Sequence, residues 1–204
     1  MSRGGSGSRR AAFLDRDGVI NVDHGYVCRR EDFSFVPGVL EGARRLHQLG
    51  FALVVITNQS GIGRGLYSVH AFEQLTAWMK AQFDAAGAPL VGVYYCPHHP
   101  TEAVGDDRRP CECRKPAPGM LLAAARELGL DLGASVLFGD KESDLLAARA
   151  AGVPGRVLLG TDAAVMPAAP ASPGLATALF RRLDEAMSDT TLLNALHVPS
   201  SVNG

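Results

Sequence analysis

The chain has 204 residues, of which 47% are hydrophobic and 20% charged, and a formal net charge of −1. This length and hydrophobic content predict one globular domain with a sizeable core. The near-neutral charge gives no electrostatic basis for binding nucleic acid or an anionic membrane surface, and no apolar stretch approaches the length of a membrane span.

The first ten residues are rich in glycine, serine and arginine, and no apolar segment long enough for a secretion signal follows them. We therefore expect a cytoplasmic protein with a disordered leader over residues 1–10, a single domain over 11–187 and a C-terminal tail over 188–204. We predict a loop over 160–172, whereas 175–187 is compatible with either a strand or a helix. The tail is expected to be ordered in part at best.

Short apolar runs alternate with segments of helical periodicity between the leader and this loop. The predicted strands are 11–14, 52–57, 91–95, 135–138 and 156–159. The predicted helices are 38–49, 68–86, 119–128 and 143–151, the second of which begins at a serine suited to capping it. This alternation predicts an α/β fold with a Rossmann-like, doubly wound parallel sheet, whose ligand site lies beyond the carboxyl ends of the strands.

Two acids separated by one residue follow the first predicted strand, in Asp15-Arg16-Asp17-Gly18. A carboxylate can attack phosphorus, and a second can protonate the leaving alkoxide and then activate water. A divalent cation would offset the repulsion between the acids and a phosphate dianion. Taken alone, the motif is equally compatible with a loop that carries two solvated acids.

Three further positions at predicted strand or helix ends suit the same chemistry. Thr57 with the following loop could cradle phosphoryl oxygens, Lys115 could neutralise phosphate charge, and Asp140 could supply a hard oxygen ligand for Mg²⁺. Each also has an ordinary interpretation, as a polar loop, a surface lysine or a helix-capping aspartate. Their joint order along the chain is far more specific than any one of them.

A cysteine and histidine cluster lies in the polar segment 96–113. Three thiols and one imidazole, at Cys96, His98, Cys111 and Cys113, suit tetrahedral Zn²⁺ with no open position, which predicts a structural site. On spacing alone His99 could replace His98. Unrelated thiols are the alternative; a disulfide is disfavoured by the closeness of Cys111 and Cys113, and a nucleic-acid-binding finger by the charge balance.

These motifs in this order resemble the haloacid-dehalogenase-like (HAD) phosphatases. The segment Asp23-His24-Gly25-Tyr26, the run Thr57-Asn58-Gln59-Ser60 and the Cys/His segment resemble its heptose bisphosphate phosphatase subfamily, with the histidinol-phosphate phosphatases as near relatives. The resemblance extends from about Ala11 to Leu159. It implies Mg²⁺-dependent hydrolysis of a small sugar phosphate, and His98 as the zinc ligand.

The resemblance also implies a role for individual residues. Asp15 would be the nucleophile and Asp17 the general acid and base, while Mg²⁺ would be held by Asp15, the backbone carbonyl of Asp17, and Asp140. Thr57 and Lys115 would hold the transferring phosphoryl group. The remaining residues expected near the substrate are Asp23, His24, Gly25, Tyr26, Asn58, Gln59, Ser60, Arg114 and Lys141.

The intervals between the motifs limit what can cover the site. Neither the stretch from Asp17 to Thr57 nor that from Thr57 to Lys115 has room for a separate folded domain. We therefore expect a capless, monomeric enzyme with an open site. A histidinol-phosphate phosphatase and a non-catalytic phosphosugar-binding protein remain the alternatives.

Overall fold

The structure is a computed structural model that describes residues 9–160 and 168–197. It contains one six-stranded sheet in the order β3-β2-β1-β4-β5-β6, and every neighbouring pair is parallel. The strands are β1 (Arg9–Leu14), β2 (Ala52–Asn58), β3 (Leu90–Cys96), β4 (Leu130–Gly139), β5 (Gly155–Leu159) and β6 (Ala178–Phe180). The predicted doubly wound parallel sheet is confirmed.

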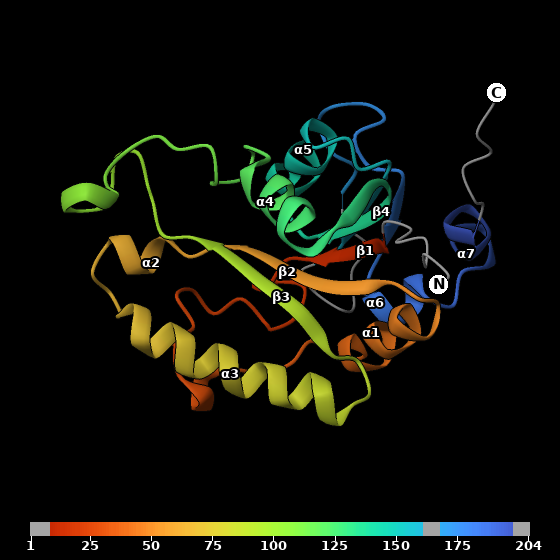
Figure 1. Cartoon of the computed structure of the whole chain (residues 1–204), viewed down its shortest axis with the longest axis horizontal. Coiled ribbons are helices and arrows are strands. Elements are labelled where there is room, and N and C mark those ends of the chain that lie inside the picture. Colours follow the sequence, from red (N-terminus) through yellow and green to blue (C-terminus); the bar gives the residue numbers. More distant parts are fainter. Residues whose placement is uncertain (1–8, 161–167, 198–204) are drawn as a thin grey trace, which may run out of the picture.

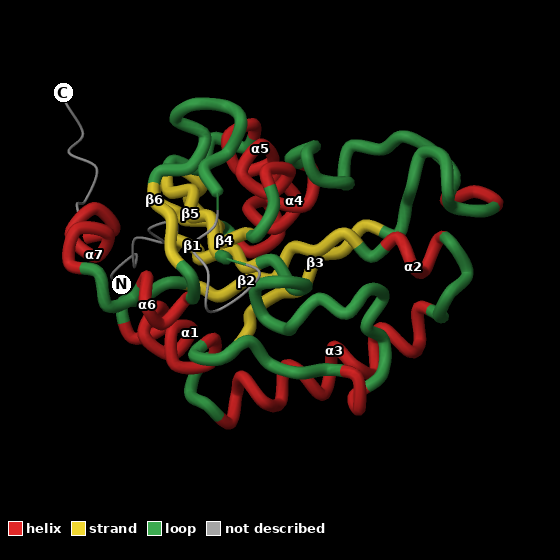
Figure 2. Tube along the Cα trace, turned by 180° about the vertical axis from the view of Figure 1, so that it is seen from behind, coloured by secondary structure: helices red, strands yellow, loops and turns green. Residues whose placement is uncertain are grey.

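Helices cover both faces of this sheet (Figures 1 and 2). Alternate residues of β1 point to opposite faces, so that Ala12 and Leu14 join one apolar core and Ala11 and Phe13 the other. The first core is completed by α1 (Val39–Gln48), α3 (Val69–Ala85), α6 (Leu183–Ala186) and α7 (Thr190–His197). The second is completed by α4 (Gly119–Leu128) and α5 (Glu142–Ala150).

The four predicted helices correspond to α1, α3, α4 and α5, with ends that shift by one residue or less. Ser68 caps α3 as predicted, because its Oγ accepts a hydrogen bond of 3.1 Å from the backbone N–H of Ala71. The short helix α2 (Ser60–Gly63) and the 3-10 turns η1 (Arg30–Asp32) and η2 (Gly105–Asp107) were not predicted. They are too short to produce a hydrophobic period.

The chain ends differ from the expectations in two places. Arg9 and Arg10 belong to β1, so the predicted leader is two residues too long; residues 1–8 lie outside the described part. The guanidinium of Arg10 donates to the backbone carbonyls of Leu49 and Leu196 and so fixes this end of the strand. The stretch 175–187 contains both a strand, β6, and a helix, α6.

The predicted tail from residue 188 begins with helix α7, in which Leu192 is buried against the first core. Residues 161–167 of the predicted loop and residues 198–204 of the tail lie outside the described residues. Within the described ranges, no helix is long and apolar enough to cross a membrane. The intervals between Asp17, Thr57 and Lys115 hold only the elements above, so the expectation of a capless fold is confirmed.

Candidate active site

A cavity of about 480 Å³ opens at the carboxyl edge of the sheet, beyond the ends of β1, β2 and β4. Twelve of the thirteen predicted catalytic, phosphate- and substrate-binding residues line it: Asp15, Asp17, Asp23, Gly25, Tyr26, Thr57, Asn58, Gln59, Ser60, Arg114, Lys115 and Lys141. His24 instead lines a second hollow of about 400 Å³ that shares Gly25 and Tyr26 with this cavity. The predicted magnesium ligand Asp140 lies behind the cavity wall, next to Gly18.

Three buried charged side chains form the floor of the cavity. Nζ of Lys115 lies 2.8 Å from Oδ1 of Asp15 and 2.6 Å from Oδ1 of Asp144, and donates to the carbonyl of Ile56 at 3.1 Å. Burial raises the pKa of Asp15 well above its usual value, against the opposing effect of Lys115. Burial alone would lower the pKa of Lys115, but the carboxylates of Asp144 and Asp15 raise it, so the lysine is cationic.

The carboxylate of Asp17 faces the cavity with 18% of its side chain exposed and accepts hydrogen bonds from three residues. Nε of Arg16 lies 3.2 Å from both of its oxygens, and Nη2 lies 2.9 Å from Oδ1. Nδ2 of Asn21 donates to Oδ1 at 3.0 Å, and Nε2 of Gln59 donates to Oδ2 at 2.9 Å. The direction of this carboxylate is therefore fixed by its neighbours.

The segment after β2 links Asp17 to the predicted phosphate cradle. Nε2 of Gln59 also donates to Oγ1 of Thr57 at 2.8 Å, and the hydroxyl of Tyr67 donates to Oε1 of Gln59 at 2.5 Å. Burial raises the pKa of Tyr67 to about 12, so the phenol keeps its proton as a hydrogen-bond donor. The amide of Gln59 is thereby held in one orientation.

Asn58 fixes the backbone that carries Lys115. Its Nδ2 donates to the carbonyl of Lys115, and the backbone N–H of Lys115 donates to its Oδ1, each at 3.1 Å. In the sheet, Asn58 also pairs in register with Cys96, the last residue of β3. One side chain therefore joins the end of β2 to the segment that leads into α4.

Asp140 follows β4 and carries two buried oxygens that accept no hydrogen bond. Burial raises its pKa to about 6, and the carboxylate of Asp144 acts in the same direction. A Cβ at Gly18, whose φ is +92°, would lie 2.2 Å from Oδ2 of Asp140, so only glycine lets the backbone approach this carboxylate. An oxygen each of Asp15, Asp140 and Asp144 lies within 4.8 Å of the others, which fits a hard cation such as Mg²⁺.

Ion pairs and ring contacts form the rim of the cavity. Nζ of Lys141 lies 3.2 Å from Oδ2 of Asp23, whose Oδ1 accepts from the N–H of Gly25. Although burial opposes it, these contacts lower the pKa of Asp23. Tyr26 also lines the cavity, and its hydroxyl accepts a hydrogen bond from Nη1 of Arg64, which lies 2.7 Å from Oε2 of Glu102.

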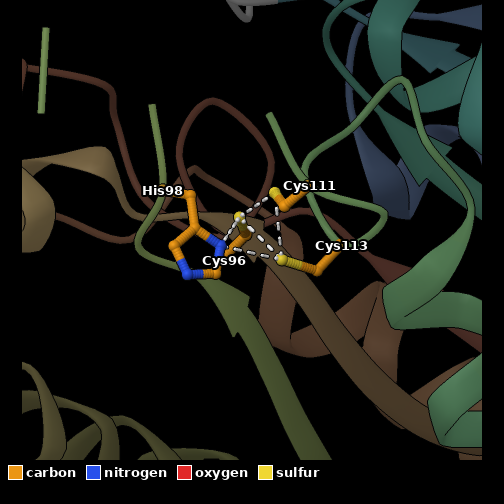
Figure 3. Close-up of side chains that lie close together, drawn as sticks. All are labelled: Cys96, His98, Cys111 and Cys113. Carbon is orange, nitrogen blue, oxygen red and sulfur yellow. Dashed lines mark hydrogen bonds between the residues drawn. The ribbon is translucent and has the colours of Figure 1, made fainter. Parts of the chain in front are cut away.

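The cysteine and histidine cluster lies beside this cavity, at the end of β3 and in the loop before α4 (Figure 3). Sγ of Cys96 lies 3.0 Å from that of Cys113 and 3.5 Å from that of Cys111, and Nδ1 of His98 lies 3.3 Å from Sγ of Cys113. His99 points elsewhere, with Nδ1 3.1 Å from the N–H of Glu102. Four such donors around one point fit a tetrahedral zinc ion.

Three contributors to the site could not be recognised in the sequence. Arg16 has no motif of its own, and Tyr67 lies outside the phosphate segment that it supports. Asp144, in the first turn of α5, carries no sequence signal for a place in the site, yet it is the nearest partner of Lys115. The sequence shows that Asp144 follows Asp140 by four residues, but this spacing does not predict the ion pair between Asp144 and Lys115.

The profile of a family described as HAD-hydrolase-like matches residues 112–185. The D-glycero-beta-D-manno-heptose-1,7-bisphosphate 7-phosphatase of Escherichia coli (strain K12) is 51% identical over 159 residues, which are 78% of this chain and 83% of that protein. The protein of the same name from Yersinia pestis is 50% identical over 151 residues, 74% of this chain and 80% of that protein.

A solved structure agrees with these relatives. The crystal structure of D,D-heptose 1,7-bisphosphate phosphatase from B. bronchiseptica, complexed with magnesium and phosphate, has a TM-score of 0.75 at 30% identity and covers 91% of this chain and 99% of that chain. The fold and the site are those of a HAD-like phosphatase, an enzyme that hydrolyses phosphoric monoesters. More narrowly, the chain belongs to the family of D-glycero-beta-D-manno-heptose-1,7-bisphosphate 7-phosphatases.

Proposed function

We propose that this enzyme removes the 7-phosphate of D-glycero-D-manno-heptose 1,7-bisphosphate through an aspartyl-phosphate on Asp15, in the synthesis of ADP-heptose for lipopolysaccharide. The observation that carries the chemistry is the contact between Asp15 and Lys115, 2.8 Å apart in the cavity that Asp17 and Thr57 also line. The relatives' names support the choice of substrate.

In the first half of the reaction, a carboxylate oxygen of Asp15 bonds to phosphorus as the bond from phosphorus to the sugar oxygen breaks. Asp17, protonated for this step, gives its proton to the departing sugar oxygen, which leaves as an alcohol. The cationic Lys115 and the hydroxyl of Thr57 hold the transferring phosphoryl oxygens. Both residues line the cavity with Asp15, so the charge that develops on phosphorus meets fixed donors.

In the second half, a water molecule attacks phosphorus and the bond from phosphorus to Asp15 breaks. Asp17 now accepts a proton from that water, and inorganic phosphate leaves with Asp15 restored. The exposed side of the Asp17 carboxylate faces the cavity, where both the leaving oxygen and the water must lie. One group can therefore act as acid and then as base.

Two metal ions complete the proposal. The carboxylates of Asp15 and Asp140, with the backbone carbonyl of Asp17, would hold Mg²⁺, which supplies positive charge against the phosphate dianion. The oxygens of Asp140 accept no hydrogen bond, and the nearest cation, Nζ of Lys141, lies 3.7 Å from Oδ2, which supports this assignment. Asp144 forms a closer ion pair of 2.6 Å with Lys115 and accepts a hydrogen bond from the N–H of Lys141. Cys96, His98, Cys111 and Cys113 would hold a structural Zn²⁺.

A phosphate-release screen over sugar phosphates in the presence of Mg²⁺ tests the proposal. It includes both anomers of the heptose 1,7-bisphosphate, histidinol phosphate and hexose monophosphates, and it compares kcat/KM between them. We expect the heptose bisphosphate to exceed every other ester. A preference for histidinol phosphate would overturn the proposed substrate in favour of histidinol phosphate. Binding of these esters without release of phosphate would show that the protein is a binding protein and not an enzyme.

A further inference from the structure

The buried guanidinium of Arg16, between the two catalytic acids, is not explained by the chemistry above. Its side chain is 2% exposed, and Nη1 is buried without a hydrogen-bond partner. Burying a charge with a donor left unpaired disfavours folding, and a hydrophobic residue of similar volume would be more favourable there. Such a cost points to a functional use of the side chain.

The contacts of Arg16 show what that use is. Nε and Nη2 together hold the carboxylate of Asp17, at 3.2 Å and 2.9 Å from Oδ1. Nη2 also donates to the carbonyl of Val27 at 2.8 Å, and the guanidinium lies 5.8 Å from the centre of the Phe72 ring. The planar guanidinium is thus fixed on the protein side, and only the carboxylate that it holds is open to the cavity.

We infer that Arg16 is a positioning residue that aims the Asp17 carboxylate at the leaving oxygen of the substrate. This inference rests on the proposed role of Asp17 as general acid. Arg16 lies behind Asp17 and does not line the cavity, so its effect passes through the carboxylate. Asn21 and Gln59 each give Asp17 one further hydrogen bond, but only the guanidinium contacts both of its oxygens.

Leaving groups of different basicity separate a positioning role from a merely structural one. A sugar alkoxide needs a proton as it departs, whereas p-nitrophenolate leaves without one. For both esters kcat/KM reports the steps up to cleavage of the phosphorus–oxygen bond, so hydrolysis of the aspartyl-phosphate does not enter the comparison. If Asp17 is no longer oriented by Arg16, kcat/KM should therefore fall for the sugar phosphate and change little for the aryl phosphate.

The experiment measures kcat/KM for a sugar phosphate and for p-nitrophenyl phosphate in wild type, Arg16→Met and Arg16→Lys. We expect Arg16→Met to lose about 100-fold on the sugar phosphate and less than about fivefold on the aryl phosphate. Arg16→Lys keeps the charge but cannot contact both oxygens in one plane, so it should lose at least about tenfold on the sugar phosphate alone.

Arg10→Met is the matched control, because Arg10 lies on β1, the strand that precedes Arg16, donates only to backbone carbonyls and does not line the cavity. It should leave the ratio of the two kcat/KM values unchanged. Equal losses on both esters in the Arg16 variants, or failure of both variants to fold, would make Arg16 structural and overturn the inference. Wild-type turnover tests the proposed function separately, since it involves no change at Arg16.

Discussion

The ammonium group of Lys115 lies 2.6 Å from Oδ1 of Asp144, and the two side chains are only 3% and 1% exposed. The other oxygen of Asp144 accepts from the backbone N–H of Lys141 at 3.0 Å, which closes the first turn of α5. Asp144 therefore connects a lysine of the cavity floor to the helix that follows the predicted metal ligand Asp140. The ion pair between Lys115 and Asp144 therefore contributes both to the arrangement of the site and to the free energy of unfolding.

Replacing Asp144 with alanine should destabilise the protein by about 3–5 kcal/mol, because it leaves a buried ammonium short of a partner and opens the cap of α5. Urea unfolding followed by circular dichroism measures the loss. Asp144→Asn keeps the shape of the side chain, so its free energy of unfolding should lie between those of Asp144→Ala and wild type. Glu142→Ala, in the same turn but partly exposed, is the control, and an equal loss there would contradict the interpretation.

Asp15→Asn should lower phosphate release by about three orders of magnitude or more, because the amide cannot attack phosphorus. Its melting temperature should not fall. Burial raises the pKa of Asp15, which means that the ionised carboxylate is disfavoured in the folded protein, and the neutral amide removes that penalty. Steady-state assays and differential scanning calorimetry give the two numbers. Undiminished hydrolysis would exclude Asp15 as the nucleophile.

Removing the zinc that we propose for the cluster of Cys96, His98, Cys111 and Cys113 should raise KM about tenfold while kcat changes less than about threefold. Arg114 holds its place through the loop, since its Nη1 donates to the carbonyl of His98 at 3.1 Å. Lys115 is held independently, by Asn58 and Asp144. Kinetics of chelator-treated protein, with Mg²⁺ restored in excess, measure both constants. Cys113→Ala should reproduce the effect, and unchanged KM in both preparations would show that the Cys/His segment 96–113 does not orient Arg114.

Arg64→Gln should raise KM for a sugar bisphosphate about tenfold and leave KM for p-nitrophenyl phosphate within about twofold. Arg64 joins Tyr26, at the cavity rim, to Glu102 in the Cys/His segment 96–113, so its loss affects the part of the site that a larger substrate reaches. Glu102→Gln keeps the arginine and serves as the matched variant. Similar KM changes for both esters would place Arg64 at the transferring phosphoryl group instead.

Much of this architecture could be predicted because strong local signals carry it. The strands that end at Leu14 and Gly139 each finish in a short apolar run, and the parallel pairing of β1 with β4 brings Asp15 next to Asp140. Cys96 and His98 could be assigned to a common site from their spacing to Cys111 and Cys113.

The interactions that no local pattern encodes could not be predicted. Lys115 and Asp144 lie far apart in the sequence and meet only because α4 and α5 pack on the same face of the sheet. Arg16 is a charged residue in a segment where exposure is the ordinary expectation, yet the fold buries it. The helix after residue 188 has eight residues, and Leu192 is buried only because the helix packs against the first core, whose other members lie far away in the sequence.

Asn58 contacts both ends of the loop that carries the proposed zinc ligands. It pairs in register with Cys96, where the loop begins, and holds the backbone of Lys115, where the loop ends. The loop reaches away from the body of the molecule between these two points (Figures 1 and 2). The free energy of closing a loop rises only slowly with its length. Residues 97–114 can therefore differ in length and sequence at little cost to the stability of the fold. A change in the sequence of this loop should therefore alter the surroundings of the cavity while Asn58 keeps Lys115, the residue that we propose to bind the phosphoryl group, in place.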